Sequence, residues 1–138
     1  MEEKSLIGYA MGQLKQSYAP YSNFHVAAAL LSKSGKVYVG SNIENASFSA
    51  TVCAERVAFF RAVSEGEYEF SKIAIVGGKD SNHLEYCPPC GVCRQVMREF
   101  TNPEEFVVLI AKSVEDYQSF QLSELLPMSF GPDYLMDR

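Results

Sequence analysis

Apolar and polar residues alternate along the chain in patterns that predict helices and strands in turn. Residues 2–17 carry apolar side chains at helical spacing, whereas residues 24–31 are nearly all apolar and predict a buried strand. A turn at 33–36 separates this strand from a second one at 37–42, so the two form a predicted hairpin. Pro20 accounts for the end of the first helix, because proline disfavours helical backbone in the residue before it.

The rest of the chain continues the alternation. The predicted elements are a helix over 53–65, a strand over 72–76, a helix over 90–100, a strand over 106–111, a fifth strand over 117–122 and a helical turn over 122–126. The segments without periodicity are 43–52, the long loop 79–89 and the tail 127–138. Helices that alternate with strands favour one sheet covered by helices.

Composition narrows the class of protein. A chain of 138 residues, of which 47% are hydrophobic, predicts a single globular domain over 1–138. The net charge is -5 and the basic residues are scattered, so nucleic acid is not an expected partner. The longest apolar runs, 26–31 and 106–111, are far shorter than a membrane span. The first residues lack the pattern of a signal peptide, so we expect a cytoplasmic protein whose cysteines are not in disulfides.

The cysteines carry the clearest chemical signal. Cys90 and Cys93 lie three residues apart at the start of a predicted helix, so both thiols share one face and can bind one Zn²⁺. A C-x-x-C pair alone is also typical of redox dithiols. Cys53 stands at the start of another predicted helix. If both helix amino ends face one point, their partial positive charges offset the negative charge of a zinc–trithiolate group.

Glu55 and Arg56, which follow Cys53 closely, suggest how such a site would act. Arg56 is three residues from Cys53, so it can donate hydrogen bonds to the sulfur, although a solvated surface arginine is the alternative. Glu55 is long enough to reach back over the first helical turn and contact a water molecule at the metal without being a ligand. With Pro89 before Cys90, the sequence has the C-A-E and P-C-x-x-C pattern of the three-cysteine zinc deaminases.

Cys87 leaves other metal sites open. With the other three cysteines it could close a four-cysteine structural zinc site or hold an iron–sulfur cluster. An extended Pro88-Pro89 segment would keep Cys87 roughly 9 Å from Cys90. A ferredoxin-type fourth cysteine is followed by proline, whereas Cys53 is followed by alanine. We therefore favour an open zinc site of three cysteines, with one ion per chain.

The sequence resembles the small, homotetrameric cytidine deaminases across nearly its whole length. The resemblance rests on five segments, which are residues 20–24, 42–46, 53–56, 89–95 and 125–127. It implies an α/β fold, a three-layer α/β/α sandwich with a mixed five-stranded sheet. It also implies zinc-dependent hydrolytic deamination of cytidine and 2′-deoxycytidine, as in pyrimidine salvage.

The resemblance assigns roles to individual residues. It implies that Cys53, Cys90 and Cys93 bind zinc, that Glu55 moves protons, and that the Ala54 amide holds the base carbonyl. The implied nucleoside contacts are Phe24 at the base, Asn42 and Glu44 at the ribose hydroxyls, and Phe130 inserted into a neighbouring subunit's site. The chain departs from the usual family pattern at Phe48, where tyrosine is usual, and at Ser49, Ala50, Cys87 and Met128.

Plainer interpretations exist for the substrate-contacting residues. Phe24 can be an ordinary core residue, and Asn42 can be an ordinary turn residue. Glu44 can be a surface residue, and Phe130 can cover the domain's own core. Gly131-Pro132 predicts an extended tail. Two rival functions also fit part of the pattern: a deaminase of a cytosine-containing antibiotic such as blasticidin S, and a non-enzymatic module with structural zinc.

Overall fold

The computed structural model describes residues 1–136. Its helices are α1 (Glu3–Gln13), α2 (Ala54–Ser64), α3 (Gly91–Phe100) and α4 (Leu122–Leu125), with short 3₁₀ turns η1 (Leu14–Gln16), η2 (Phe48–Ala50) and η3 (Pro132–Tyr134). Its strands are β1 (His25–Ser32), β2 (Val37–Ser41), β3 (Phe70–Gly78), β4 (Leu84–Glu85), β5 (Val107–Ala111) and β6 (Tyr117–Gln121). In this part of the chain no helix combines the length and apolar character needed to cross a bilayer.

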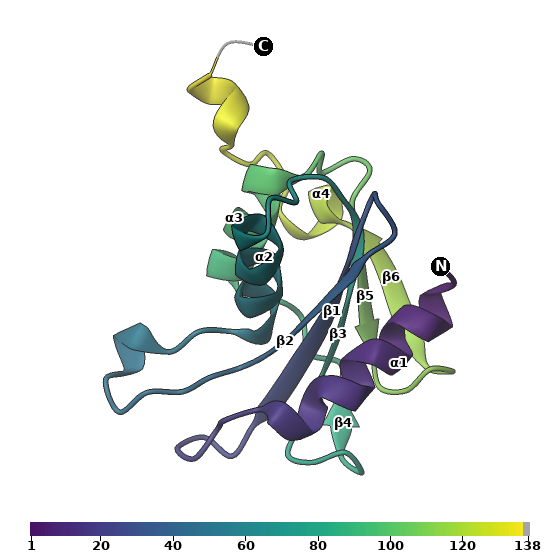
Figure 1. The fold of residues 1–138 in the computed structure, drawn as a ribbon, viewed down its shortest axis with the longest axis vertical. Coiled ribbons are helices and arrows are strands. Elements are labelled where there is room, and N and C mark those ends of the chain that lie inside the picture. Colours follow the sequence, from purple (N-terminus) through teal and green to yellow (C-terminus); the bar gives the residue numbers. More distant parts are fainter. Residues whose placement is uncertain (137–138) are drawn as a thin grey trace.

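The strands form one mixed sheet in the order β2-β1-β3-β5-β6, and β4 pairs with β3 off this path. Strands β3 and β5 are parallel, and the other pairings are antiparallel. The parallel pair requires a crossover, which contains α3. Because β2 and β3 run in the same direction, the helices that follow them, α2 and α3, begin at the same edge of the sheet (Figure 1).

Helices cover both faces of the sheet, which makes the predicted three-layer sandwich (Figure 1). One apolar core lies between the sheet and α2 and α3; its fully buried side chains include Phe59, Ile75 and Met97. The second core lies under α1 and includes Leu6 and Leu109. Successive side chains of β1 and β3 point alternately into the two cores, because side chains alternate between the faces of a strand.

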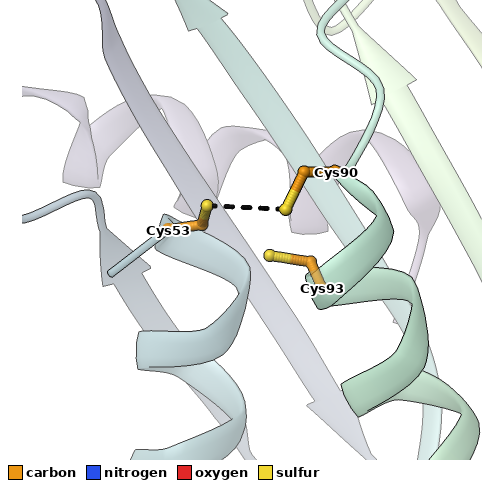
Figure 2. A group of neighbouring side chains, drawn as sticks. All are labelled: Cys53, Cys90 and Cys93. Atoms are coloured by element: carbon orange, nitrogen blue, oxygen red, sulfur yellow. Dashed lines mark hydrogen bonds between the residues drawn. The ribbon is translucent and has the colours of Figure 1, made fainter. Parts of the chain in front are cut away.

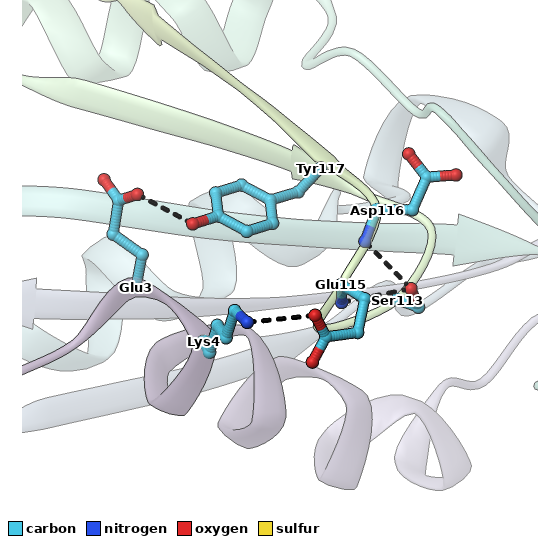
Figure 3. A network of polar contacts seen from close by, with 6 residues as sticks. All are labelled: Glu3, Lys4, Ser113, Glu115, Asp116 and Tyr117. Atoms are coloured by element: carbon cyan, nitrogen blue, oxygen red, sulfur yellow. Dashed lines mark hydrogen bonds and ion pairs between the residues drawn. The ribbon is translucent and has the colours of Figure 1, made fainter.

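Polar contacts tie α1 to the turn between β5 and β6 (Figure 3). The Tyr117 hydroxyl donates to Glu3 at 3.0 Å, and the Lys4 ammonium contacts the Glu115 carboxylate at 2.9 Å. Ser113 closes the turn by accepting the backbone N–H of Asp116 at 3.0 Å. These contacts lie on the α1 layer, opposite the layer that contains the cysteines, so they belong to the scaffold.

The predicted elements are all present, with bounds that differ by a few residues, but three expectations were wrong. The sheet has six strands rather than five, because the loop 79–89 contains the two-residue strand β4, which is too short to give a periodic pattern. The segment 43–52, expected to be irregular, contains η2. Gly131-Pro132 does not keep the tail extended: Pro132 begins η3, since the fixed φ of proline suits the first helical position. The last two residues of the predicted tail, 137–138, lie outside the described residues.

Candidate metal centre

Three sulfur atoms converge at the shared edge of α2 and α3. The Sγ atoms of Cys53, Cys90 and Cys93 all lie within 4.8 Å of one another, and those of Cys53 and Cys90 are 3.8 Å apart (Figure 2). Tetrahedral coordination with Zn–S bonds of about 2.3 Å requires sulfurs roughly 3.8 Å apart. The three thiols are therefore already spaced for one zinc ion.

The local sequence explains this convergence. Cys53 and Cys90 are the N-cap residues of α2 and α3, both with extended backbone and neither with a side-chain capping hydrogen bond. Ordinary caps use a Ser, Thr, Asp or Asn oxygen to accept the first amides of the helix. Here sulfur stands in that position, so both amino ends direct partial positive charge at the thiols. Cys93 lies one turn into α3 and is fully buried.

The electrostatics of the cluster favour a thiolate at Cys53. A hydrogen bond from Cys93 is the largest factor that lowers the pKa of Cys53 to about 5, and Arg56 adds to it against the opposing effect of burial. The same hydrogen bond, with burial, raises the pKa of Cys93. Without a metal the cluster thus holds one thiolate and a neighbouring thiol. Zinc would replace that proton, because it binds the deprotonated form.

Glu55 lies beside the cluster in the first turn of α2. Only 4% of its surface is exposed, and burial raises the pKa of its carboxyl to about 7. Among residues 1–136, its Oε1 atom is buried without a hydrogen-bond partner. A buried carboxyl oxygen of this kind needs a partner that the described residues do not provide, and a water molecule at the metal would be one.

Arg56 is on the sulfur side of α2, as its spacing predicts. Its Nη2 atom donates to the Sγ atom of Cys53 at 3.4 Å. This contact contradicts the alternative of a purely solvated arginine. The guanidinium places a permanent positive charge next to the thiolates.

Cys87 does not belong to the cluster. Among the described residues, only the other three cysteines form a group with metal-binding spacing. The Cys87 thiol packs instead on Gly77, where an added Cβ would lie 3.0 Å from its sulfur. Burial is the main factor that raises the pKa of Cys87 to about 12, so it remains a thiol at neutral pH.

Asn42 and Glu44 lie just beyond β2, on the chain between that strand and α2. They are 8% and 7% exposed, so Glu44 is not the surface residue of the plainer interpretation. Glu44 Oε1 accepts the backbone N–H groups of Tyr21 and Ser22, and its Oε2 accepts the Ser22 hydroxyl. These hydrogen bonds, chiefly from the Ser22 hydroxyl, lower the pKa of Glu44.

Asn42 is held as firmly. Its Oδ1 accepts the Val26 N–H at 3.0 Å and the Ser17 hydroxyl, and its Nδ2 donates to the Phe24 carbonyl at 2.9 Å. The single hydroxyl proton of Ser17 is thereby used, so the contact with His25 Nδ1 at 2.9 Å requires histidine as the donor. Phe24 itself is half-buried, immediately before β1.

The sequence and the fold match known proteins over most of the chain. The family model for the cytidine and deoxycytidylate deaminase zinc-binding region matches residues 1–110. The chain belongs to this family. A cytidine deaminase from Halalkalibacterium halodurans is 43% identical over 137 residues, which cover 99% of this chain and 100% of the relative.

Other relatives agree. A probable cytidine deaminase from Dictyostelium discoideum is 38% identical, over 98% of this chain and 88% of its own. The crystal structure of cytidine deaminase from Burkholderia pseudomallei superposes with a TM-score of 0.85 at 41% identity, covering 94% of this chain and 100% of that one. The structure from Mycobacterium tuberculosis gives 0.79 at 35% identity, covering 95% and 98%. The family domain binds zinc, and the three-cysteine cluster is the group of described residues that could hold it.

Phe130 lies apart from the cluster in its own subunit. It is 56% exposed and stacks on Tyr134, with ring centroids 5.2 Å apart. It does not cover the domain's own core, which was the alternative. The tail that carries it runs beside α3 and projects from the body of the molecule (Figure 1).

Reasoning from the sequence missed several residues that hold the site together. Ser17 and Ser22 support Asn42 and Glu44, and Gln95 and Arg98 hold the tail. The two serines flank the Pro20 break and resemble ordinary turn residues, so only their partners reveal their role. Arg98 gave no signal either, because an arginine near the end of a helix resembles an ordinary solvated residue until its partners in the tail are known.

Proposed function

We propose that this chain is a zinc-dependent cytidine deaminase, which hydrolyses cytidine and 2′-deoxycytidine to uridine and 2′-deoxyuridine with release of ammonia, as a cytoplasmic step of pyrimidine salvage. One observation carries the proposal: the buried, unpartnered Glu55 carboxyl lies beside three sulfurs with zinc spacing. A purely structural zinc site would require a fourth protein ligand and no acid–base group, and Cys87 is not in the cluster.

Cys53, Cys90 and Cys93 would hold the metal. Zinc there supplies Lewis acidity, which makes water a nucleophile near neutral pH. Glu55 accepts a proton from the attacking water and delivers it to N3 of the cytosine ring. Glu55 then takes the remaining proton of the hydroxyl added at C4 and gives it to the amino group, so that C4 becomes a carbonyl and ammonia leaves as the C4–N bond breaks. A carboxyl whose pKa lies at about 7 suits both directions of transfer.

Other residues position the base. Ala54 is the first residue of α2, so its N–H has no partner within the helix and is available to the base carbonyl. Phe24 packs on the base from the edge of β1. Arg56 offsets the charge of the thiolates, which keeps the metal sufficiently electrophilic.

The hydrogen bonds around Asn42 and Glu44 support a sugar hydroxyl as their ligand. Asn42 Oδ1 already accepts two donors, so what it has left to offer is one N–H of its amide. Glu44 is an acceptor whose Oε2 takes one donor from residues 1–136, the Ser22 hydroxyl. A neighbouring donor and acceptor suit a group that both accepts and donates, which a hydroxyl does. A phosphate monoester cannot match this pair and would be repelled by Glu44.

The test is an assay of the purified protein with metal analysis. We expect loss of cytidine absorbance and zinc near one ion per chain. Cytidine and 2′-deoxycytidine should react, whereas 3′-deoxycytidine should fall in kcat/KM by roughly 10²-fold or more, since a site built for a hydroxyl rejects an analogue without it. Cytidine 5′-monophosphate should be poor. A faster reaction with blasticidin S, or zinc without turnover of any cytosine compound, would contradict the proposal.

We further propose a homotetramer in which Phe130 completes the site of a neighbouring subunit. Its support is that Phe130 is exposed and that the tail which carries it projects from the body of the molecule (Figure 1). Exposed aromatic surface on a tail favours burial against a partner. Glu55→Gln subunits mixed with Phe130→Ala subunits should then form hybrids more active than the sum of the two parents. Hybrids verified by mass that show only that sum would contradict a shared site.

A further inference from the structure

Helix α3 holds the end of α4 and the C-terminal tail through three long polar side chains. Arg94 Nη1 donates to the Leu125 carbonyl at 2.6 Å, and Gln95 Nε2 donates to the Phe130 carbonyl at 2.9 Å. Arg98 makes two further contacts one turn later. The helix that provides two zinc ligands therefore also fixes the path of the tail.

Arg98 is the centre of this attachment. The residue is 9% exposed; its Nε donates to the Ser129 hydroxyl at 2.8 Å and its Nη2 to Asp133 Oδ1 at 2.7 Å. A planar guanidinium can make both contacts at once because its donors point in fixed, different directions. The two partners flank Phe130, so the backbone on both sides of that residue is tied to one buried side chain.

Gly131 makes this arrangement sterically possible. A Cβ added there would lie 2.2 Å from Nη1 and 2.3 Å from Cζ of Arg98. Its φ of -155° is extended and open to any residue, so the requirement for glycine comes only from the close approach of the guanidinium. Any side chain at 131 must displace either Arg98 or the tail.

The fixed tail presents aromatic surface away from its own active site. Phe130 and Tyr134 stack nearly parallel, with an interplanar angle of 19°, and are 56% and 64% exposed. Arg98 lies eight residues after Cys90, about 12 Å along the helix axis. The tail projects beyond the carboxyl end of α3 (Figure 1), whereas Cys53 and Cys90 stand at the amino ends of α2 and α3.

We propose that Arg98 and Gly131 form a clamp that positions the aromatic arm, residues 129–134, for the active site of the neighbouring subunit. The inference rests on the proposed shared site and goes beyond it, because Arg98 and Gly131 contact no substrate. Arg98 is a positioning residue whose effect is exerted in another subunit. The arm is a preformed element rather than a segment that becomes ordered on assembly, which limits the entropy lost on insertion.

The experiment uses Gly131→Ala in the full-length, zinc-loaded enzyme. We expect kcat/KM for cytidine to fall by about 10²-fold, since a displacement near 1 Å of a positioning group can have an effect of that size. Zinc should stay at one ion per chain, because no ligand is touched. Gly12→Ala is the matched control: an added Cβ there meets nothing within 4 Å, so activity should be unchanged.

Subunit mixing separates a clamp that acts on the neighbour from simple damage. Gly131→Ala subunits have an intact Glu55, and Glu55→Gln subunits have an intact arm. Hybrids of the two should exceed the summed activity of the parents, as hybrids made with Phe130→Ala should. Arg98→Lys keeps the positive charge but loses the planar guanidinium that contacts two partners at once. Its hybrids with Glu55→Gln subunits should likewise exceed the summed activity of the parents.

Three results would overturn the clamp. Gly131→Ala could retain full activity, or it could lose activity and zinc together, which would indicate support of its own α3. It could also lose activity that true hybrids do not restore, although hybrids with Phe130→Ala do. If hybrids with Phe130→Ala also fail, the shared site itself is wrong, and the clamp loses its role with it.

Discussion

Helices α2 and α3 both begin at a cysteine, meet at one cluster and bury apolar side chains in the same core, yet their other contacts with the rest of the protein differ. Helix α2 sits directly on β2, where a Cβ at Gly40 would lie 2.5 Å from the Ala54 carbonyl oxygen. The fully buried residues of α2 include Ala54, Ala58 and Ala62, and Arg61 adds a hydrogen bond to the Val39 carbonyl at 2.7 Å. Helix α3 instead uses Arg94 and Arg98 to reach backbone and side-chain oxygens of distant segments.

The difference separates two tasks. A helix packed backbone to backbone has no room to move, which suits α2 because it carries Glu55, the proposed proton carrier. A helix attached through long side chains can connect the metal cluster to a remote segment, which suits α3 and its tail. The predictions that follow test this division, from the largest expected effect to the smallest.

The largest effect should come from Glu55→Gln on α2. The amide keeps the size of the side chain and removes the proton carrier, so turnover should fall by about 10²–10⁴-fold or more while zinc remains bound. The measurement is kcat with cytidine, alongside metal content. Glu99→Gln, a change at an exposed residue of α3, is the control and should leave kcat and zinc content unchanged. Glu55→Gln activity within threefold of the wild type would assign proton transfer to another group.

The second prediction compares the two half-buried cysteines in the zinc-free protein. At pH 7 Cys53, with a pKa of about 5, is thiolate, whereas Cys87, with a pKa of about 12, is about 10⁻⁵ thiolate. The higher intrinsic nucleophilicity of the more basic thiolate recovers about 10³ of this difference. A small disulfide reagent should therefore modify Cys53 about 10²-fold faster, as peptide mass mapping would measure. Faster reaction at Cys87 would contradict the assigned electrostatics.

Much of this site could be predicted because its signals are local in sequence. Cys53, Glu55, Cys90 and Cys93 stand at fixed spacing at predicted helix starts, and the structure brings the three sulfurs together. The alternation of elements also gave the layers of the fold. These features depend on neighbours along the chain, which periodicity and capping patterns report.

The rest depends on contacts between segments far apart in sequence. Strand β4 has two residues and exists only because β3 accepts it. The bond from Arg98 to Asp133 joins residues 35 apart, and the bond from Ser17 to Asn42 joins residues 25 apart. The tail turn at Pro132 follows a glycine whose neighbourhood is filled by an arginine of α3. No single-sequence pattern specifies such partners.

The third prediction tests the close packing of α2. In Gly40→Ala the new methyl group overlaps backbone atoms, which cannot rotate away, so α2 must shift. Overpacking of this kind typically costs about 1–3 kcal/mol. We expect a lower thermal midpoint and, since Glu55 moves with the helix, a larger loss in kcat than in zinc content. Gly12→Ala is the control, with no overlap. Unchanged stability would show that α2 is as adaptable as α3.

The smallest effect should come from Ser17→Ala, which probes the polar network around Asn42. Ser17 donates to Asn42 Oδ1, which also accepts the Val26 N–H, while Asn42 Nδ2 donates to the Phe24 carbonyl. The two backbone contacts are enough to set the orientation of the Asn42 amide. Removing the hydroxyl thus deletes one hydrogen bond without allowing the amide to turn. Such a bond contributes about 0.5–1.5 kcal/mol, so KM for cytidine should rise only about 2- to 10-fold with kcat nearly unchanged. Ser5→Ala, on the exposed side of α1, is the control. A 100-fold effect would mean that Ser17 sets the orientation of Asn42, and the α2 side would then depend on long-range polar contacts as much as α3 does.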